Sequence, residues 1–312
     1  MKYPVFDFHC DTSDYLAKGK PLYENDLHID LKRASKFPGY AQCFACYTTD
    51  ICDADPVLVL EKKLAAINRE LERNSKYIRQ AYTAEDIEAN YCEGIMSAIL
   101  TLEGSAGYGF DPELLEDLYL AGTRVASLCW NEKNVLTGSN QTGGGLTDLG
   151  RTFVKKAQKL GILIDVSHIS DDGFWDIMDI TDAPVIATHS NSRSLCNHPR
   201  NITDEMFLQI CNTGGIVGIN LYAGFIGKAQ TLDCLCDHIF HFLSLDPSGE
   251  HIALGGDLDG CDNLAIGFTD VECYANLAEN LENRGLGEDI IKKIFWNNSI
   301  EVMRRAVRNH KK

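Results

Sequence analysis

The chain has 312 residues, of which 45% are hydrophobic and 24% are charged, a composition typical of globular proteins that bury a large core. It contains 45 acidic and 29 basic side chains, so its formal net charge is -16 at pH 7. A surface of that sign repels nucleic-acid phosphates and anionic lipid, and we therefore expect neither nucleic-acid nor membrane partners.

The N-terminus and the cysteines indicate a cytoplasmic protein. The opening stretch, MKYPVFDFHCD, has no basic segment that leads into an apolar run, as a secretory signal would have. No run approaches the ~18 apolar residues of a membrane span. Of the 12 cysteines, several lie inside apolar runs, which favours reduced, buried thiols over disulfides. Cys43 and Cys46, or Cys234 and Cys236, could each form half of a zinc knuckle, although neither pair has a second pair at finger-like spacing.

Short apolar runs of strand length recur along the chain, each closed by a polar or glycine-rich turn. They are YPVFDFHCD (3–11), QCFACYTT (42–49), MSAILTLEG (96–104), RVASLCW (124–130), GILIDVSH (161–168), PVIATHS (184–190), GGIVGIN (214–220) and HIALGGDLDG (251–260). Several are nearly continuous in Val, Ile, Leu and Ala, which is typical of strands buried on both faces.

Helical patterns lie between most of these runs. The predicted helices span residues 57–73, 111–120, 148–160, 170–179, 203–212, 232–245, 270–284 and 288–308, with a further helix that begins after Thr83. Thr83 and Asp86 resemble a capping box in which Asp replaces the usual Glu or Gln. Thr203, followed by Asp204 and Glu205, places acids at the positive end of a helix dipole.

Strand–helix alternation, repeated about eight times, predicts parallel strands joined by crossover helices. Eight such units in 312 residues fit one closed (β/α)8 barrel, a TIM-like α/β fold whose usual length is ~250 residues. A doubly wound open sheet is the main alternative. No linker rich in Pro, Gly or Ser divides the chain, so residues 1–312 are predicted to form a single barrel domain.

Polar side chains follow the predicted strands at their carboxyl ends, which form the active-site face of such a barrel. The candidates are His9 and Asp11 after the first run, Glu103 after the third, His168 after the fifth, His189 after the sixth, and Asp257 and Asp259 after the eighth. Because side chains alternate along a strand, His9 and Asp11 are expected to share one face of their strand, and Asp257 and Asp259 one face of theirs. Gly255 and Gly256 are expected to let the backbone approach a ligand closely.

Imidazole nitrogens and carboxylate oxygens are together typical ligands of zinc-like cations. Each candidate has an ordinary structural explanation when taken alone, such as a helix-capping Asp11 or a salt-bridged Glu103. Their joint occurrence at strand ends favours a metal site. The set His9, Asp11, Glu103, His168 and His189 exceeds the roughly four ligands of one catalytic zinc, which favours two cations and a bridging carboxylate.

In these stretches the sequence resembles the membrane (renal) dipeptidase family of zinc metallopeptidases, and among them the microbial-type members. The matching stretches are residues 7–11, 102–104, 145–150, 161–168, 188–190, 199–202, 217–220 and 255–260. They extend over nearly the full length of the chain. Each is short, but their order and spacing together are highly specific.

The resemblance implies a (β/α)8 barrel with a dinuclear zinc centre at its C-terminal face. Position by position, it implies that His9 and Asp11 bind one Zn2+, that Glu103 bridges both, and that His168 and His189 bind the second. Other divalent cations are an alternative to zinc. The resemblance also implies that Arg200 lies near the substrate's carboxylate, that Asp257 is the acid/base residue and that the protein is a homodimer.

Two departures from the family pattern concern the substrate pocket. Vertebrate members carry a histidine after the fourth strand, where this chain has Trp130 and Asn131. The family tyrosine that helps to bind the substrate carboxylate falls at Phe225 or at nearby Tyr222. We therefore expect these four residues to join Arg200 in contacting the substrate and to alter its choice.

These features predict a zinc-dependent dipeptidase that hydrolyses the peptide bond of dipeptides. One alternative is a related barrel amidohydrolase that acts on N-acyl amino acids or another small amide, as the Trp130 departure suggests. Another is a non-catalytic, metal-dependent binding protein, against which the complete ligand set and Asp257 argue.

Overall fold

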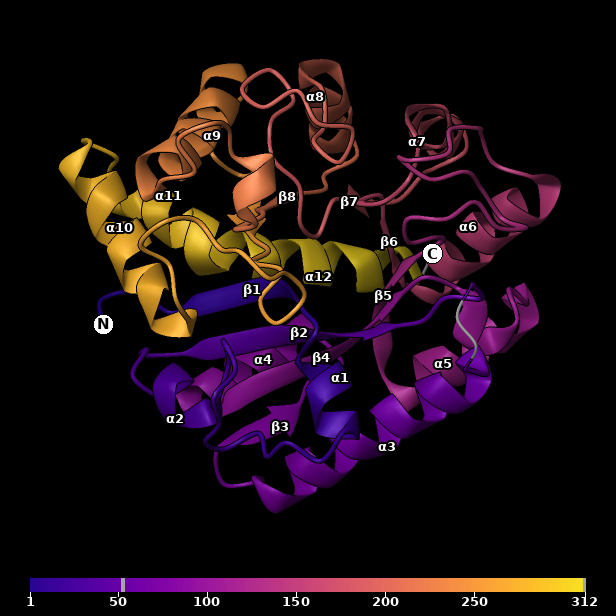
Figure 1. The fold of residues 1–312 in the computed structure, drawn as a ribbon, viewed down its shortest axis with the longest axis horizontal. Helices are drawn as coiled ribbons and strands as arrows, with labels where there is room; N and C mark the ends of the chain where they lie inside the picture. The colour runs from indigo at the N-terminus through magenta and orange to yellow at the C-terminus, as the bar shows by residue number, and fades with distance from the viewer. Residues whose placement is uncertain (52–53, 311–312) are drawn as a thin grey trace.

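The fold is a (β/α)8 barrel, seen in a computed structural model that describes residues 1–51 and 54–310, with side chains described through residue 306 (Figure 1). The barrel strands are β1 (Val5–Cys10), β2 (Tyr40–Tyr47), β4 (Met96–Glu103), β5 (Thr123–Ser127), β6 (Leu163–Asp165), β7 (Val185–Ile186), β8 (Val217–Ile219) and β9 (Ile252–Leu254). All of the predicted strands are therefore present. The structure adds β3 (Ile78–Gln80), which pairs with the start of β4 outside the ring.

The strands are parallel and follow the order β7-β6-β5-β4-β2-β1-β9-β8. A bridge between Ala187 and Val217 joins the two ends of this order, and the backbone N–H of Ala187 donates to the carbonyl of Ile216 at 3.0 Å. This bridge brings β7 beside β8 and closes the ring. The predicted barrel is therefore confirmed, and the open doubly wound sheet is wrong.

The predicted helices are present, with differences at their ends. The helices are α1 (Thr12–Ala17), α2 (Leu31–Ala34), α3 (Pro56–Arg73), α4 (Ala84–Cys92), α5 (Leu115–Ala121), α6 (Asp148–Leu160), α7 (Asp171–Met178), α8 (Asp204–Asn212), α9 (Leu232–Leu245), α10 (Tyr274–Asn283), α11 (Glu288–Lys292) and α12 (Asn298–His310), with short turns η1 (Ala106–Tyr108), η2 (Pro112–Leu114), η3 (Ala223–Phe225) and η4 (Val271–Cys273). The capping box is confirmed, because Thr83 Oγ1 accepts from Asp86 N at 3.1 Å and Asp86 Oδ2 accepts from Thr83 N at 2.9 Å. The helix predicted over 288–308 is interrupted by the π-helical segment η5 (Lys293–Asn297).

Two apolar layers stabilise the barrel. The inner layer fills the ring with alternate strand residues, including Phe6, Phe8 and Cys43. Segments η5 and α12 cover this layer, and the Trp296 ring meets the Phe6 ring edge-on with centroids 6.1 Å apart. The outer layer, which includes Cys46, lies between the strands and the surrounding helices. The polar strand ends are thereby held on a rigid support.

The cysteines fit the prediction of reduced thiols. Throughout the described part of the chain, which leaves out Cys52, the cysteines are free. Cys43 and Cys46 belong to different layers, so they do not share a cation, and Cys234 and Cys236 are two residues apart on α9, a spacing that points side chains apart. Among the described residues, no helix is long and apolar enough to cross a membrane.

Candidate metal centre

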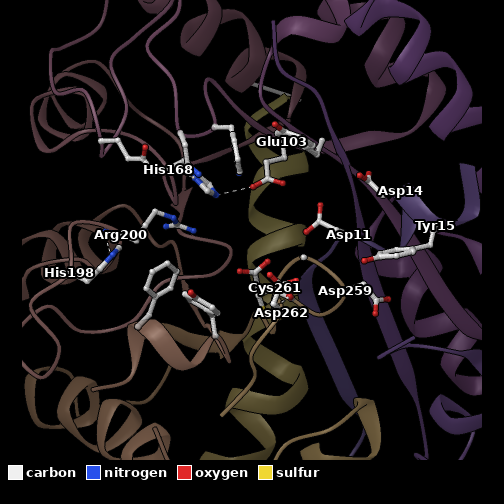
Figure 2. Close-up of a pocket in the computed structure, with 18 of the residues that line it drawn as sticks. Asp11, Asp14, Tyr15, Glu103, His168, His198, Arg200, Asp259, Cys261 and Asp262 are labelled. Atoms are coloured by element: carbon white, nitrogen blue, oxygen red, sulfur yellow. Dashed lines mark hydrogen bonds and ion pairs between the residues drawn. The ribbon is translucent and has the colours of Figure 1, made fainter. Parts of the chain in front are cut away.

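Side chains from four strand ends meet at the carboxyl-terminal mouth of the barrel. His168 Nε2 lies 2.9 Å from Glu103 Oε1, and His9 Nε2 lies 3.5 Å from Glu103 Oε2. His9 Nε2 is 3.3 Å from Asp11 Oδ2, and the Nε2 atoms of His168 and His189 are 3.1 Å apart. Glu103 therefore lies between the histidines, as Figure 2 shows for its contact with His168.

A bulge at the end of β1 aims His9 at this cluster. The register between β1 and β2 shifts between Asp7 and Cys10, so simple strand alternation does not determine where His9 points. The buried Asp7 carboxylate holds the bulge in place. It accepts hydrogen bonds from the backbone N–H groups of His9 (3.0 Å) and Gly256 (2.9 Å) and from the hydroxyl of Tyr274 (2.6 Å).

Hydrogen bonds fix the ring orientations of His168 and His189, each of which lies three residues beyond the end of its strand. Thr188 Oγ1 donates to Asp165 Oδ2 at 2.7 Å, so it must accept from His189 Nδ1, which is also 2.7 Å away. Asn131 Oδ1 accepts from His168 Nδ1 at 3.0 Å. Both rings therefore carry their proton on Nδ1, and their Nε2 lone pairs face the cluster.

The residues of this cluster fit a metal ion. Two unprotonated Nε2 atoms at 3.1 Å repel each other, and so do such an atom and a carboxylate oxygen at 2.9 Å, unless a cation lies between them. His9 Nε2 is buried without a hydrogen bond. Burial lowers the pKa of His168 to about 4 and lowers the pKa of His189 well below its usual value, so both rings are neutral near pH 7. Neutral imidazoles beside carboxylates are the donor set of a zinc-type cation.

Asp257 and Asp259 follow β9 in a left-handed backbone. β9 ends at Leu254, and the φ angles of the two aspartates are 56° and 64°. The prediction that they share a strand face is therefore wrong, because the segment is not extended. Asp257 Oδ2 accepts from Asn220 Nδ2 at 3.1 Å, whereas Asp259 Oδ2 accepts from Thr12 Oγ1 at 2.6 Å.

The glycines of this segment serve two purposes. A Cβ atom on Gly255 would lie 1.7 Å from the carbonyl oxygen of Thr188, so this glycine admits the backbone that follows β7 and not a ligand, contrary to expectation. A Cβ atom on Gly260 would lie 2.1 Å from Asp11 Oδ2 and 2.5 Å from Asp257 Oδ1. Gly260 therefore keeps the space beside the candidate metal ligands open.

A cavity of about 520 Å³ opens above the cluster, within the usual size range of small-molecule sites. Glu103, His168 and Asp257 line its floor. Figure 2 shows Arg200 and His198 on one side of the cavity and Asp14 and Tyr15 on the opposite side. Arg200 makes one wall cationic, whereas the wall formed by α1 carries both Asp14 and Lys18.

The cationic wall contains three of the predicted substrate-binding residues. The guanidinium of Arg200 is buried, donates to the carbonyl oxygens of Ser167 and of His189 (3.3 Å), and lies 5.5 Å from the centre of the Phe225 ring. Phe225 meets Tyr222 edge-on at 4.7 Å between ring centroids, and both line the cavity.

Trp130 and Asn131 line the cavity next to the metal cluster. The Trp130 ring lies between those of Tyr47 and His168, with centroid distances of 4.9 Å and 6.2 Å. Asn131 was predicted to contact substrate, but its side-chain oxygen is taken by His168. Its position therefore suits the orientation of a candidate metal ligand as well as contact with a substrate.

Several supporting residues were missed in the sequence. Asp165 and Asn220 had a usable signal, because each is a polar side chain that ends an apolar run, as the recognised candidates do. Thr188 had a weaker signal as the neighbour of His189. His198 had none, because it lies in the loop between β7 and α8 and reaches the cavity only through the folding of that loop.

Comparisons with known proteins identify the family of this chain. The whole chain, residues 1–312, matches the membrane dipeptidase family, Peptidase family M19. An uncharacterised protein encoded upstream of pqqA in Klebsiella pneumoniae is 30% identical over 266 residues, which cover 81% of this chain and 97% of that protein.

Two solved structures are similar to this fold at 26% sequence identity. One is a dipeptidase described as a metallopeptidase of family M19, with a TM-score of 0.90 over 97% of this chain and 98% of that one. The other is a metallopeptidase from Rhodobacter sphaeroides bound to a phosphinate mimic of the dipeptide L-Ala-D-Ala, with a TM-score of 0.87 over 97% of this chain and 99% of that one. The chain therefore belongs to the membrane dipeptidase family, and it is a metallopeptidase of the kind that hydrolyses dipeptides.

Proposed function

We propose that the protein is a dipeptidase that uses two Zn2+ ions at the mouth of its barrel. His9 and Asp11 would hold one ion, His168 and His189 would hold the other, and Glu103 would bridge them. The observation that carries this proposal is the approach of three Nε2 atoms to the two oxygens of Glu103, at 2.9, 3.5 and 3.8 Å. Five ligands in one cluster exceed the roughly four of a single catalytic zinc.

Asp257 is proposed as the acid/base residue. Two cations held beside it would supply Lewis-acid polarisation of the scissile carbonyl and a more acidic water. Asp257 would accept a proton from the attacking water and return it to the leaving amine. Burial raises the pKa of Asp257, which makes its carboxylate a better proton acceptor. Asn220 engages Oδ2, and Oδ1 has no hydrogen-bond partner among the described residues.

Arg200 is proposed to bind the C-terminal carboxylate of the substrate. A guanidinium has five N–H donors, and the contacts of Arg200 with Ser167, Ser190 and His189 use at most three of them. The remaining donors and the buried positive charge suit a carboxylate. A carboxylate held next to the scissile bond restricts the substrate to short peptides. The ligand of the Rhodobacter sphaeroides relative supports a dipeptide here and makes L-D dipeptides natural test substrates.

The test is the release of free amino acids from L-L and L-D dipeptides by zinc-loaded and chelator-treated protein. We expect cleavage by the zinc-loaded protein alone, and weaker cleavage of dipeptide amides, which lack the carboxylate for Arg200. If zinc-loaded protein released no amino acids from any of the dipeptides, the proposal would be overturned. Cleavage of N-acyl amino acids alone would select the related amidohydrolase, and dipeptide binding without product would select a binding protein.

We also propose that residues 1–312 act as one barrel domain, in the cytoplasm and as a homodimer. The cytoplasmic location rests on the free cysteines of the described residues, and the homodimer rests on the family resemblance. Sedimentation of the purified protein tests the oligomeric state, and a monomer at micromolar concentration would contradict it.

A further inference from the structure

A second group of metal-binding side chains lies far from the cavity. Cys211 is in the last turn of α8, Asp246 directly follows α9, and His251 directly precedes β9. The sulfur of Cys211, a carboxylate oxygen of Asp246 and a ring nitrogen of His251 all lie within 4.8 Å of one another. Helix carboxyl ends and strand amino ends meet at the barrel face opposite the active site, so this group is separate from the candidate zinc centre.

The imidazole of His251 has a tautomer that leaves one nitrogen free to bind a metal ion. Its Nδ1 lies 2.7 Å from the carbonyl oxygen of Gly215, and a carbonyl can only accept a hydrogen bond. Nδ1 therefore carries the proton, and Nε2 keeps a lone pair for a cation. A metal-binding histidine usually donates its other N–H to a carbonyl or carboxylate in this way.

Asp246 and Cys211 supply two further donors. Ser248 holds the Asp246 carboxylate, because its backbone N–H donates to Oδ1 at 3.1 Å and its hydroxyl donates to Oδ2 at 2.8 Å. Each carboxylate oxygen keeps lone pairs for a cation. Burial and the nearby Asp246 raise the pKa of Cys211 to about 12, so the thiol is protonated near neutral pH and a bound cation would displace its proton.

We propose that Cys211, Asp246 and His251 form a separate binding site for one zinc-type cation. Sulfur, nitrogen and oxygen donors together favour zinc over calcium or magnesium, which prefer oxygen alone. Three donor atoms within 4.8 Å of one another can approach one cation at zinc bond lengths of ~2.0–2.3 Å after small side-chain shifts. All three residues are half-buried, which leaves a fourth position for water. A cation here links the ends of α8, α9 and β9, so its role is structural.

The test is titration of metal-free, full-length protein with Co2+, followed by absorption spectroscopy. Thiolate-to-cobalt charge transfer in the near ultraviolet reports a cysteine ligand, and the candidate zinc centre contains none. We expect three bound equivalents and a charge-transfer band in the wild type. Cys211→Ser and His251→Gln are expected to lose the band and one equivalent while they keep the other two.

Two other cysteines provide matched controls. Cys261 lines the active-site cavity and Cys92 is exposed, so Cys261→Ser and Cys92→Ser are expected to keep the band. Asp246→Asn leaves the thiol and imidazole in place and is expected to weaken Co2+ binding without loss of fold, as circular dichroism would show. Binding of only two equivalents of Co2+ to the wild type, without a charge-transfer band, would overturn the proposal. A band that persists in Cys211→Ser but disappears in Cys261→Ser or Cys92→Ser would overturn it as well.

Discussion

Thr188→Val is expected to weaken both the fold and metal binding, because the Thr188 hydroxyl connects Asp165 to His189. Valine has nearly the same shape but cannot make the two hydrogen bonds of 2.7 Å. One of these bonds is to a carboxylate, and together a charged and a neutral hydrogen bond contribute roughly 2–4 kcal/mol to the free energy of unfolding. Loss of a group that orients a metal-binding histidine costs roughly 10–100-fold in metal affinity or activity.

Two assays separate these effects. Urea unfolding of metal-free protein measures the free energy of unfolding, and competition with a zinc-binding dye measures metal affinity. Thr188→Ser keeps the hydroxyl and is expected to restore both. Thr152→Val, at an exposed position on α6, controls for the loss of a threonine hydroxyl. Wild-type zinc affinity in Thr188→Val would refute the inference that Thr188 and Asp165 orient His189.

Three further changes test the site. Asp257→Asn is expected to lower kcat by about 10²–10⁴-fold, while elemental analysis still finds two bound cations. Wild-type turnover in this variant would show that Asp257 is not the acid/base residue. Gly260→Ala brings a Cβ within 2.1 Å of Asp11 Oδ2 and is expected to reduce the metal content of the protein. Gly287→Ala is the control, because the space around Gly287 is open, and equal metal content in the two variants would contradict the expectation. Burial and the charge of Glu103 raise the pKa of Asp11 to about 7 in the metal-free protein, so protons compete with the cation below that pH. Calorimetry is expected to show that the Kd for the cation rises about tenfold for each unit by which the pH falls below 7, for each proton displaced. A Kd that does not change with pH would refute this expectation.

The barrel was predictable because its strands are short, nearly continuous apolar runs, a pattern that buried parallel strands produce. The strand β3 was missed, since in its three residues only Ile78 is buried and no apolar run marks it. Helices α1 and α2 were missed for a related reason: they have 6 and 4 residues, too few to show helical periodicity.

The convergence of candidate ligands was predictable because parallel strands end at one face of a barrel. The structure brings His9, Asp11, Glu103, His168 and His189 together there. Alternation along the strands could not supply their orientations. A bulge aims His9, hydrogen bonds with Thr188 and Asn131 hold His189 and His168, and left-handed backbone carries Asp257. The hydrogen bonds of Asp165 with Thr188 and of Asn131 with His168 join residues 23 and 37 positions apart, so local sequence patterns do not predict them.

Side chains at four strand ends are proposed to hold two cations, with Glu103 between them. Anomalous X-ray scattering at the zinc absorption edge, measured on crystals of zinc-loaded protein, tests this arrangement most directly. We predict two peaks at the barrel mouth, about 3.5–4 Å apart, one beside His9 and Asp11 and the other beside His168 and His189. A single peak at the barrel mouth, or none beside Glu103, would contradict the claim.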